Sequence, residues 1–210
     1  GIGVWRAAFK PLVDRIADTD IRLQWFCCDR STGVTDASGN RITLIRDTQS
    51  PVAVEYQAVK FIGTGRDNIK AGVFSGWELG DYIYLRSEEA YMIKMEALAH
   101  KGSAEAVTEL NSFMKTRQPD YNYTFTNKAD LIEEIIYQKR VEFWGEGLEY
   151  IDNRRLNIPV DRTDETWGAE NNNHFSAGKF RYNQEDRPFL YQLPLSEIEN
   201  NSQLSPSDQN

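Results

Sequence analysis

The sequence predicts a mainly α-helical protein with a loop-rich region and a few short strands, on three observations. Apolar residues recur at helical spacing from residue 84 to about residue 100. A second run with this period extends to about residue 117, and a third extends from residue 128 to residue 156. Residues 1–80 lack the period, so we expect an irregular region over 1–80 and a helical region over 81–210.

The first predicted helix carries an apolar stripe that we expect to be buried. Four residues form it at i, i+7, i+11 and i+14: Tyr84, Tyr91, Met95 and Leu98. Three more apolar residues flank it: Leu85, Met92 and Ala99. Gly102 suits the left-handed position that ends many helices, and Ser103 is a good cap for the next helix. Residues 84–117 should therefore fold back as an antiparallel pair.

The third predicted helix begins after Thr126 or Asn127, either of which can cap it. Its expected buried stripe is Leu131, Ile132, Ile135, Ile136 and Phe143. Two glycines interrupt the helix near residue 145, and the helical period continues to residue 156, so the third helix is expected over 128–156. Residues 157–210 are expected to form loops and a terminal short helix.

The first 80 residues contain only short signals of secondary structure. Residues 12–21 carry a brief helical stripe, and residues 21–26 alternate as a strand does. Residues 34–45 have the turn composition and flanks of a hairpin. Gly63 and Gly65 form a GxG without the third glycine of a nucleotide-binding loop, so we expect no nucleotide site there.

Composition argues against several classes of protein. The 210 residues include 24 Lys and Arg against 32 Asp and Glu, a formal net charge of −8. Nucleic acids and anionic membranes need clustered cations, and the sequence has no such cluster, which argues against a nucleic-acid partner. The longest apolar stretches fall far short of the roughly 20 residues that span a bilayer.

The first residues do not resemble a signal peptide, and we expect a piece of a longer protein.

Cysteine and histidine predict neither a metal site nor a cofactor. Cys27 and Cys28 are adjacent, and a disulfide between neighbours is strained, so we expect small buried side chains with reduced thiols. The only histidines are His100 and His174, and no CxxC motif occurs.

Glutamates on or beside the apolar stripe of the first helix are the main candidates for chemistry. In one interpretation, carboxylates such as Glu88 and Glu146 form the acid and base pair of a glycosidase. In the other, Glu88 and Glu96 pair with arginines such as Arg140 and join the helices, because a guanidinium matches a carboxylate. We favour structural ion pairs that involve Glu88, Glu96 and Arg140, since no second catalytic motif accompanies the carboxylates.

Tryptophans in loops are candidate ligand contacts. Trp5 and Trp77 lie in the irregular region, and Trp167 lies in a polar loop. A flat aromatic side chain offers an apolar face on which a sugar ring can stack. Tryptophan more often belongs to a core, so both roles stay open for each of the three.

Four segments resemble the carboxyl-terminal portion of the SusD/RagB family, in the family's order and spacing. They are YLRSEEAYMIKMEA at 84–97, AVTELNSFMKTR at 106–117, residues 135–155 with QKRVEFWGEG and DNRR, and LYQLPLSEIENN at 190–201. Gln138 and Lys139 stand where the family often has Glu and Arg.

The resemblance implies a SusD-like α/α superhelix of TPR-like helix pairs, with the third helix as scaffold. It also implies the function of this family of Bacteroidetes surface lipoproteins, which bind nutrients, usually oligosaccharides or polysaccharides. The ligand would pass to a SusC-like TonB-dependent transporter of the outer membrane, for polysaccharide utilization. A lipid anchor is expected on an amino-terminal part that is missing from this sequence.

Two other functions stay open. A helical-repeat protein can serve as an interaction subunit whose only partner is another protein. A hydrolase that uses carboxylates such as Glu88 and Glu146 is the less favoured alternative. The family resemblance implies no bond cleavage, so we expect a protein that is not an enzyme and needs no cofactor.

Overall fold

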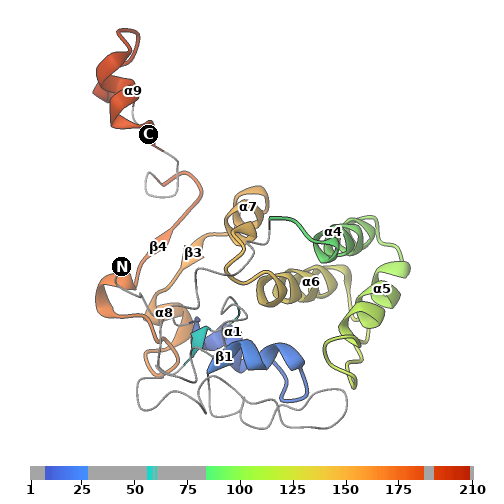
Figure 1. Ribbon diagram of the computed structural model, residues 1–210. Coiled ribbons are helices and arrows are strands. Elements are labelled where there is room, and N and C mark those ends of the chain that lie inside the picture. The colour runs from blue at the N-terminus through green and yellow to red at the C-terminus, as the bar shows by residue number, and fades with distance from the viewer. Residues whose placement is uncertain (1–7, 28–55, 59, 61–83, 187–191, 209–210) are drawn as a thin grey trace, which may run out of the picture. The chain divides into compact units, whose positions relative to one another are not determined.

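The computed structural model describes residues 8–27, 56–58, 60, 84–186 and 192–208. They form two compact units, one that ends at Glu146 and one that begins at Gly147 (Figure 1). The boundary predicted at residue 80 and the predicted hairpin over 34–45 lie outside the described residues. The mainly helical fold class predicted from the sequence is confirmed.

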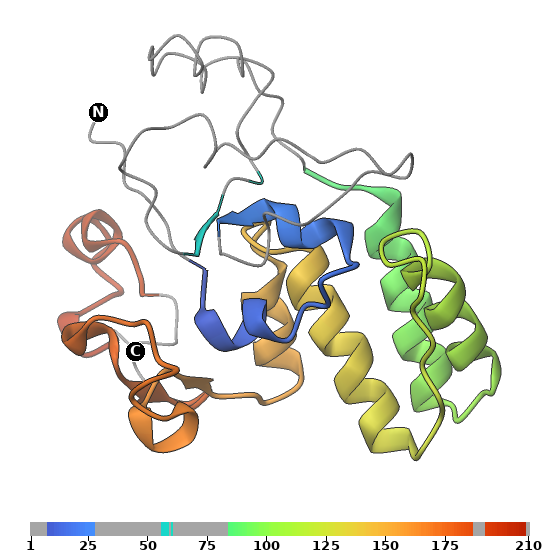
Figure 2. The same cartoon turned by 90° about the horizontal axis from the view of Figure 1, so that it is seen from below.

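Three long helices form the body of the first unit: α4 (Ser87–His100), α5 (Glu105–Met114) and α6 (Lys128–Glu142). Helix α4 lies between the other two and packs against both (Figures 1 and 2). The helices α4 and α5 lie within the predicted helix pair over 84–117. The third helix, predicted over 128–156, begins at Lys128 but ends at Glu142, and a separate helix begins at Leu148.

The ends of these helices follow the predicted local signals. Gly102 has a φ of +72° and lies just after α4. The Oγ of Ser103 accepts a hydrogen bond from the amide of Glu105 at 3.3 Å. At the start of α6, the Oδ1 of Asn127 accepts a hydrogen bond from the amide of Asp130 at 2.9 Å. These contacts satisfy backbone amides that have no partner within their own helices.

We expect Gly102→Ala to destabilise the protein by about 1 kcal/mol, because an L side chain at this positive φ is strained. Crowding adds nothing, since no atom lies within 4 Å of the position of the new Cβ. Urea unfolding followed by circular dichroism measures the change. Lys101→Ala is the control, because Lys101 is exposed and has a φ of −75°. Equal stability of the two variants would contradict the prediction.

The buried face of α4 is rotated relative to the predicted stripe. Met92, Met95 and Ala99 are buried, whereas Tyr91 is 52% exposed. Tyr84 precedes the helix and is 93% exposed. The prediction that Tyr84 and Tyr91 are buried is therefore wrong. Helix α4 packs against both α5 and α6, and this packing sets which face is buried. That face includes Met92, which the sequence analysis placed beside the stripe.

Four short elements make up the described part of the first 60 residues: α1 (Lys10–Asp14), the 3₁₀ helix η1 (Ile21–Trp25), β1 (Phe26–Cys27) and β2 (Gln57–Ala58). The strands β1 and β2 pair antiparallel. The helix predicted over 12–21 is thus shorter and begins earlier. The strand predicted over 21–26 is wrong except at its last residue. The reason is Asp20, whose side chain accepts a hydrogen bond from the amide of Arg22 and caps a helical turn.

These short elements pack on α6 through one apolar cluster. Its buried members include Val13, Ile16, Leu23, Phe26, Tyr137 and Val141. Phe26 meets the ring of Trp144 edge to face, with the ring centroids 5.7 Å apart. Burial of these side chains holds the segment before β1 against α6.

The second unit consists of short elements joined by loops. They are α7 (Leu148–Arg155), β3 (Val160–Asp161), α8 (Asp164–Trp167), η4 (Ser176–Gly178), β4 (Arg181–Tyr182), α9 (Leu195–Asn200) and η6 (Pro206–Asp208). The strands β3 and β4 pair antiparallel. For residues 157–210 the sequence predicts loops and a terminal short helix; the described part of this range also contains α8 and the strands β3 and β4. None of the helices in the described part of the chain is long and apolar enough to cross a membrane.

Candidate functional site

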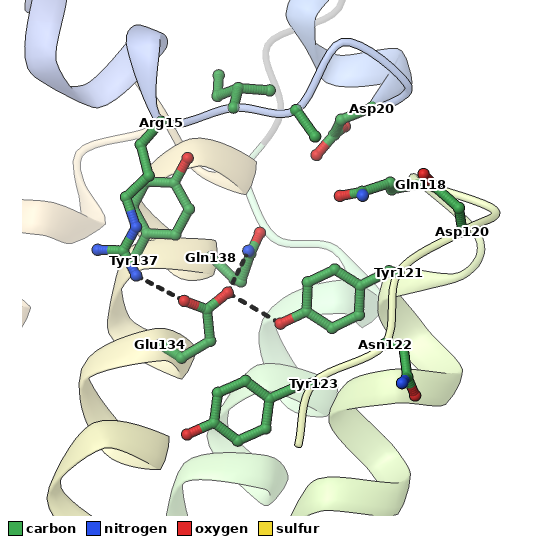
Figure 3. A pocket seen from close by; sticks show the side chains of 12 residues that line it. Arg15, Asp20, Gln118, Asp120, Tyr121, Asn122, Tyr123, Glu134, Tyr137 and Gln138 are labelled. Carbon is green, nitrogen blue, oxygen red and sulfur yellow. Dashed lines mark hydrogen bonds and ion pairs between the residues drawn. The ribbon is translucent and has the colours of Figure 1, made fainter. Parts of the chain in front are cut away.

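A pocket of about 450 Å³ opens beside α6 in the first unit. Three parts of the chain form it: residues 15–20, residues 118–123 and one face of α6 (Figure 3). Polar side chains and three tyrosines, Tyr121, Tyr123 and Tyr137, line it. Its volume lies in the range of pockets that bind small molecules, which is roughly 300–1,000 Å³.

Glu134 of α6 lies at the centre of the pocket and is held by three donors (Figure 3). Its carboxylate accepts hydrogen bonds from the Tyr121 hydroxyl at 2.8 Å, from Gln138 Nε2 at 2.6 Å and from Arg15 Nη2 at 2.6 Å. The side chain is 14% exposed. Because the donors come from all three parts of the pocket, the carboxylate has a fixed position.

Hydrogen bonds also hold residues 118–123 in place. The Thr19 hydroxyl donates to Oδ1 of Asp120 at 2.6 Å. Asn111 of α5 contacts the backbone of Tyr123 twice: its Oδ1 accepts from the amide at 2.6 Å, and its Nδ2 donates to the carbonyl at 3.0 Å. The pocket is therefore preformed, which lowers the entropy lost when a ligand binds.

The tyrosines of the pocket differ in what they offer a ligand. Tyr137 is 8% exposed, and the guanidinium of Arg15 lies 3.8 Å from its ring centroid, so this ring is covered. Tyr121 and Tyr123 are half-buried and keep part of their surface exposed. Burial and the nearby Glu134 raise the pKa of Tyr121, so its hydroxyl stays protonated and donates to Glu134.

Arg22 joins the pocket to the interior of the first unit. It is 1% exposed, and its Nε and Nη2 donate to the carboxylate of Asp20 at 3.0 and 2.7 Å. Its Nη2 also donates to the amide oxygen of Gln138. Both Asp20 and Gln138 line the pocket, so one buried guanidinium positions two groups of the pocket wall.

Arg22 also belongs to a buried ion cluster whose centre is Glu142. Its carboxylate lies 3.3 Å from Arg22, 2.7 Å from Arg86 and 3.1 Å from Arg117. Burial alone would raise the pKa of Glu142, but hydrogen bonds from Arg117 and Arg86 and the charge of Arg22 lower it to about 2. The cluster joins the segment before β1, the start of α4 and the end of α5 to α6.

The glutamates predicted to form structural ion pairs lie on α4. Glu88 lies 3.3 Å from Arg117. Glu96 is buried and lies 3.1 Å from Lys139 of α6. The ion pairs seen at Glu88 thus use Arg117 and Arg86, and the pair seen at Glu96 uses Lys139. Arg140 lies on α6 and is half-buried.

The two carboxylates considered for hydrolysis both lie beside Arg86. The distances from Arg86 are 3.7 Å to Glu88 and 2.8 Å to Glu146. The pKa of Glu88 is lowered, first by a hydrogen bond from its own backbone amide and then by Arg86 and Arg117. A general acid needs a raised pKa, so this arrangement favours a structural role over catalysis.

Of the tryptophans predicted to contact a ligand, Trp5 and Trp77 lie outside the described residues, as does Cys28. Trp167 ends α8 in the second unit and is 37% exposed. Its Nε1 donates to the carbonyl of Asp161 at 3.0 Å. Across the residues that the structure describes, no group of three or more His, Cys, Asp or Glu is placed to hold a metal ion.

The pocket was not predicted from the sequence. Its centre, Glu134, is one of several charged residues on α6, and no local pattern distinguishes it. One available signal is the Tyr-Asn-Tyr run at 121–123, directly after a helix break at Pro119. Aromatic side chains in a loop held by a rigid scaffold are typical of binding sites.

Comparison with known proteins identifies the family. The sequence model of the SusD family matches residues 56–210. Among solved structures, a SusD-like carbohydrate binding protein from Bacteroides vulgatus ATCC 8482 is similar, with a TM-score of 0.59 and 22% sequence identity. The similarity covers 92% of this chain and 40% of the other, so the chain spans about two fifths of that protein. No curated protein matches the chain at a significant level. Because the family match extends over well more than half of the sequence, the chain belongs to the SusD family.

Proposed function

We propose that the protein binds glycans without cleaving them, and that the pocket beside α6 contacts the glycan. The pocket carries the proposal, because it sets the rings of Tyr121 and Tyr123 beside the fixed carboxylate of Glu134. A sugar offers apolar C–H faces to aromatic rings and hydroxyl groups to fixed acceptors. The solved relative with the same fold is described as carbohydrate binding, which supports the same function for this chain.

Truncating an aromatic residue of the pocket should weaken glycan binding. We expect Tyr121→Ala to lower the affinity about tenfold, because removing a central aromatic costs more than ~1 kcal/mol and ~1.4 kcal/mol is a factor of ten. Isothermal titration against a panel of soluble plant and microbial glycans measures the change.

Tyr91→Ala is the matched control, since Tyr91 is 52% exposed on α4 and does not line the pocket. Unchanged affinity of a folded Tyr121→Ala variant would rule out the pocket as the contact surface. The same mixtures are assayed for new reducing ends, which cleavage of a glycan would release. A steady increase in reducing ends would overturn the proposal that the protein binds glycans without cleaving them.

Trp5, Trp77 and Trp167 are further proposed contacts. Trp167 has the clearest physical basis, because a hydrogen bond to Asp161 fixes its ring and leaves it partly exposed. An alanine variant of each of the three tryptophans is titrated against the same glycan panel, and its affinity is measured. Affinities equal to that of the unchanged protein in all three would eliminate them.

We also propose that the protein acts at the cell surface and passes its ligand to a SusC-like TonB-dependent transporter, held to the outer membrane by a lipid anchor. Family membership supports this scheme. Affinity purification from outer membranes of the source bacterium tests it, with recovery of a TonB-dependent transporter as the expected result. Recovery of the transporter together with failure of every glycan to bind would favour the interaction-subunit alternative.

A further inference from the structure

The charges that line the pocket beside α6 are mainly negative. Asp20, Asp120 and Glu134 contribute carboxylates, and Arg15 contributes the one guanidinium among the described residues of the lining. Asp20 is neutralised from behind by Arg22, whose Nη2 lies 2.7 Å from its Oδ2. Asp120 is exposed and Glu134 is partly exposed, so an entering ligand meets these two carboxylates.

Arg15 is already engaged and is a poor receptor for an anion. Its Nη2 lies 2.6 Å from Glu134, and its guanidinium covers the ring of Tyr137. A carboxylate or sulfate of a ligand would have to displace Glu134 from Arg15. The displaced glutamate would then lie close to the incoming anion, and like charges repel.

Asp120 adds a second fixed negative charge at the opposite wall of the pocket (Figure 3). The Thr19 hydroxyl donates to it at 2.6 Å. This bond, together with one from Gln118, lowers the pKa of Asp120, so the carboxylate stays ionised near neutral pH. Ionised carboxylates only accept hydrogen bonds, and they match the hydroxyl groups of a sugar, which donate them.

We propose that this pocket selects uncharged sugar residues and disfavours sugar residues that carry a carboxylate or a sulfate. This proposal rests on the proposed glycan function. Hydroxyl groups satisfy Glu134 and Asp120 without bringing a like charge near them. An anionic sugar meets both carboxylates, and among the described residues that line the pocket it finds no cation outside an ion pair.

Matched pairs of glycans test the selectivity, because the two members of each pair share one backbone and differ only at C6, where one member carries a carboxylate and the other an uncharged group. Suitable pairs are amylose and C6-oxidised amylose, soluble cellulose oligomers and their C6-oxidised forms, and methyl-esterified and de-esterified homogalacturonan. In every pair that binds, we expect the neutral member to bind about tenfold more tightly at low salt. The ratio should shrink in about 0.5 M NaCl, which screens exposed charges.

Charge-neutralising variants assign the selectivity to the pocket. Asp120→Asn and Glu134→Gln should each reduce the neutral-to-anionic ratio by about twofold to fourfold. Glu133→Gln is the control, because it removes the same charge from the neighbouring position of α6, is 78% exposed and does not line the pocket. The control also corrects for the net charge of −8, which acts on every anionic ligand.

Binding of the anionic member as tightly as the neutral one would overturn the selectivity and leave glycan binding itself intact. The selectivity would also be overturned if Asp120→Asn and Glu134→Gln changed the preference for neutral glycans no more than Glu133→Gln does. That result would place the preference outside the pocket. If no member of any pair binds, the proposed glycan function fails, and the selectivity fails with it.

Discussion

Replacing Glu142 with alanine is expected to lower the free energy of unfolding by about 3–5 kcal/mol. Three guanidiniums lie within 3.3 Å of this carboxylate, those of Arg22, Arg86 and Arg117. Glu142 and Arg22 are each 1% exposed, so water cannot take the place of the lost partner. The variant therefore leaves buried positive charge without its main counter-charge, which is a costly arrangement in a protein interior.

Urea unfolding of the purified protein measures this effect. Glu133→Ala is the matched control on the same helix, since Glu133 is 78% exposed and lies 3.9 Å from Arg15, and its loss should cost less than about 1 kcal/mol. Glu142→Gln keeps the shape and one acceptor oxygen, so its effect should lie between the two. A loss below about 1 kcal/mol for Glu142→Ala would show that the cluster contributes little.

Acid should reveal the same interaction. The arginines lower the pKa of Glu142 to about 2 in the folded protein, against an ordinary value of 4.5. A carboxyl group with a lowered pKa stabilises the fold above its unfolded pKa, and this stabilisation is lost as the pH falls toward the folded pKa. We expect the stability difference between the protein and Glu142→Gln to be constant near neutrality. It should shrink between about pH 4.5 and pH 2, and a constant difference over that range would contradict the assignment.

Local signals were sufficient to predict the three long helices of the first unit, but not its short elements α1 and η1. Gly102, Ser103 and Asn127 end or begin helices through contacts with residues at most five positions away. The periodicity of α6 also predicted the burial of Leu131, Ile135 and Ile136, because apolar residues at helical spacing lie on one side of a helix. These features depend on short-range sequence, which is why they could be predicted.

The pocket and the ion cluster depend on contacts between distant parts of the chain. Arg15 and Glu134 are 119 residues apart, and Arg22 and Glu142 are 120 residues apart. No local pattern shows which of the many charged residues will meet. The same limit explains the rotated face of α4, because its orientation is set by packing against two helices at once.

Arg22→Met should have the second large effect, and it should act on both stability and binding. We expect a loss of about 3–5 kcal/mol in the free energy of unfolding, because Asp20 and Glu142 lose a buried partner. We also expect glycan affinity to fall about tenfold. Asp20 and Gln138, which line the pocket, lose the guanidinium that positions them.

Two further variants separate the contributions of Arg22. Arg22→Lys keeps the charge but has a single ammonium group in place of the planar fork, so it cannot hold Asp20, Gln138 and Glu142 together. It should recover part of the stability and little of the affinity. Arg181→Met is the control, because it removes an arginine that is 53% exposed in the second unit. Its effect on stability should stay below about 1 kcal/mol.

Stability and binding can be measured independently in these variants. Glycan affinity is compared at a temperature at which circular dichroism shows each variant to be folded, so that a loss of affinity reports the pocket and not the folded fraction. If folded Arg22→Met binds as tightly as the unchanged protein, the ion cluster stabilises the fold without positioning the pocket. If Arg22→Lys is stable but binds weakly, the fork of Arg22 sets the positions of Asp20 and Gln138. The buried cluster would then determine glycan affinity through Asp20 and Gln138, two residues that line the pocket.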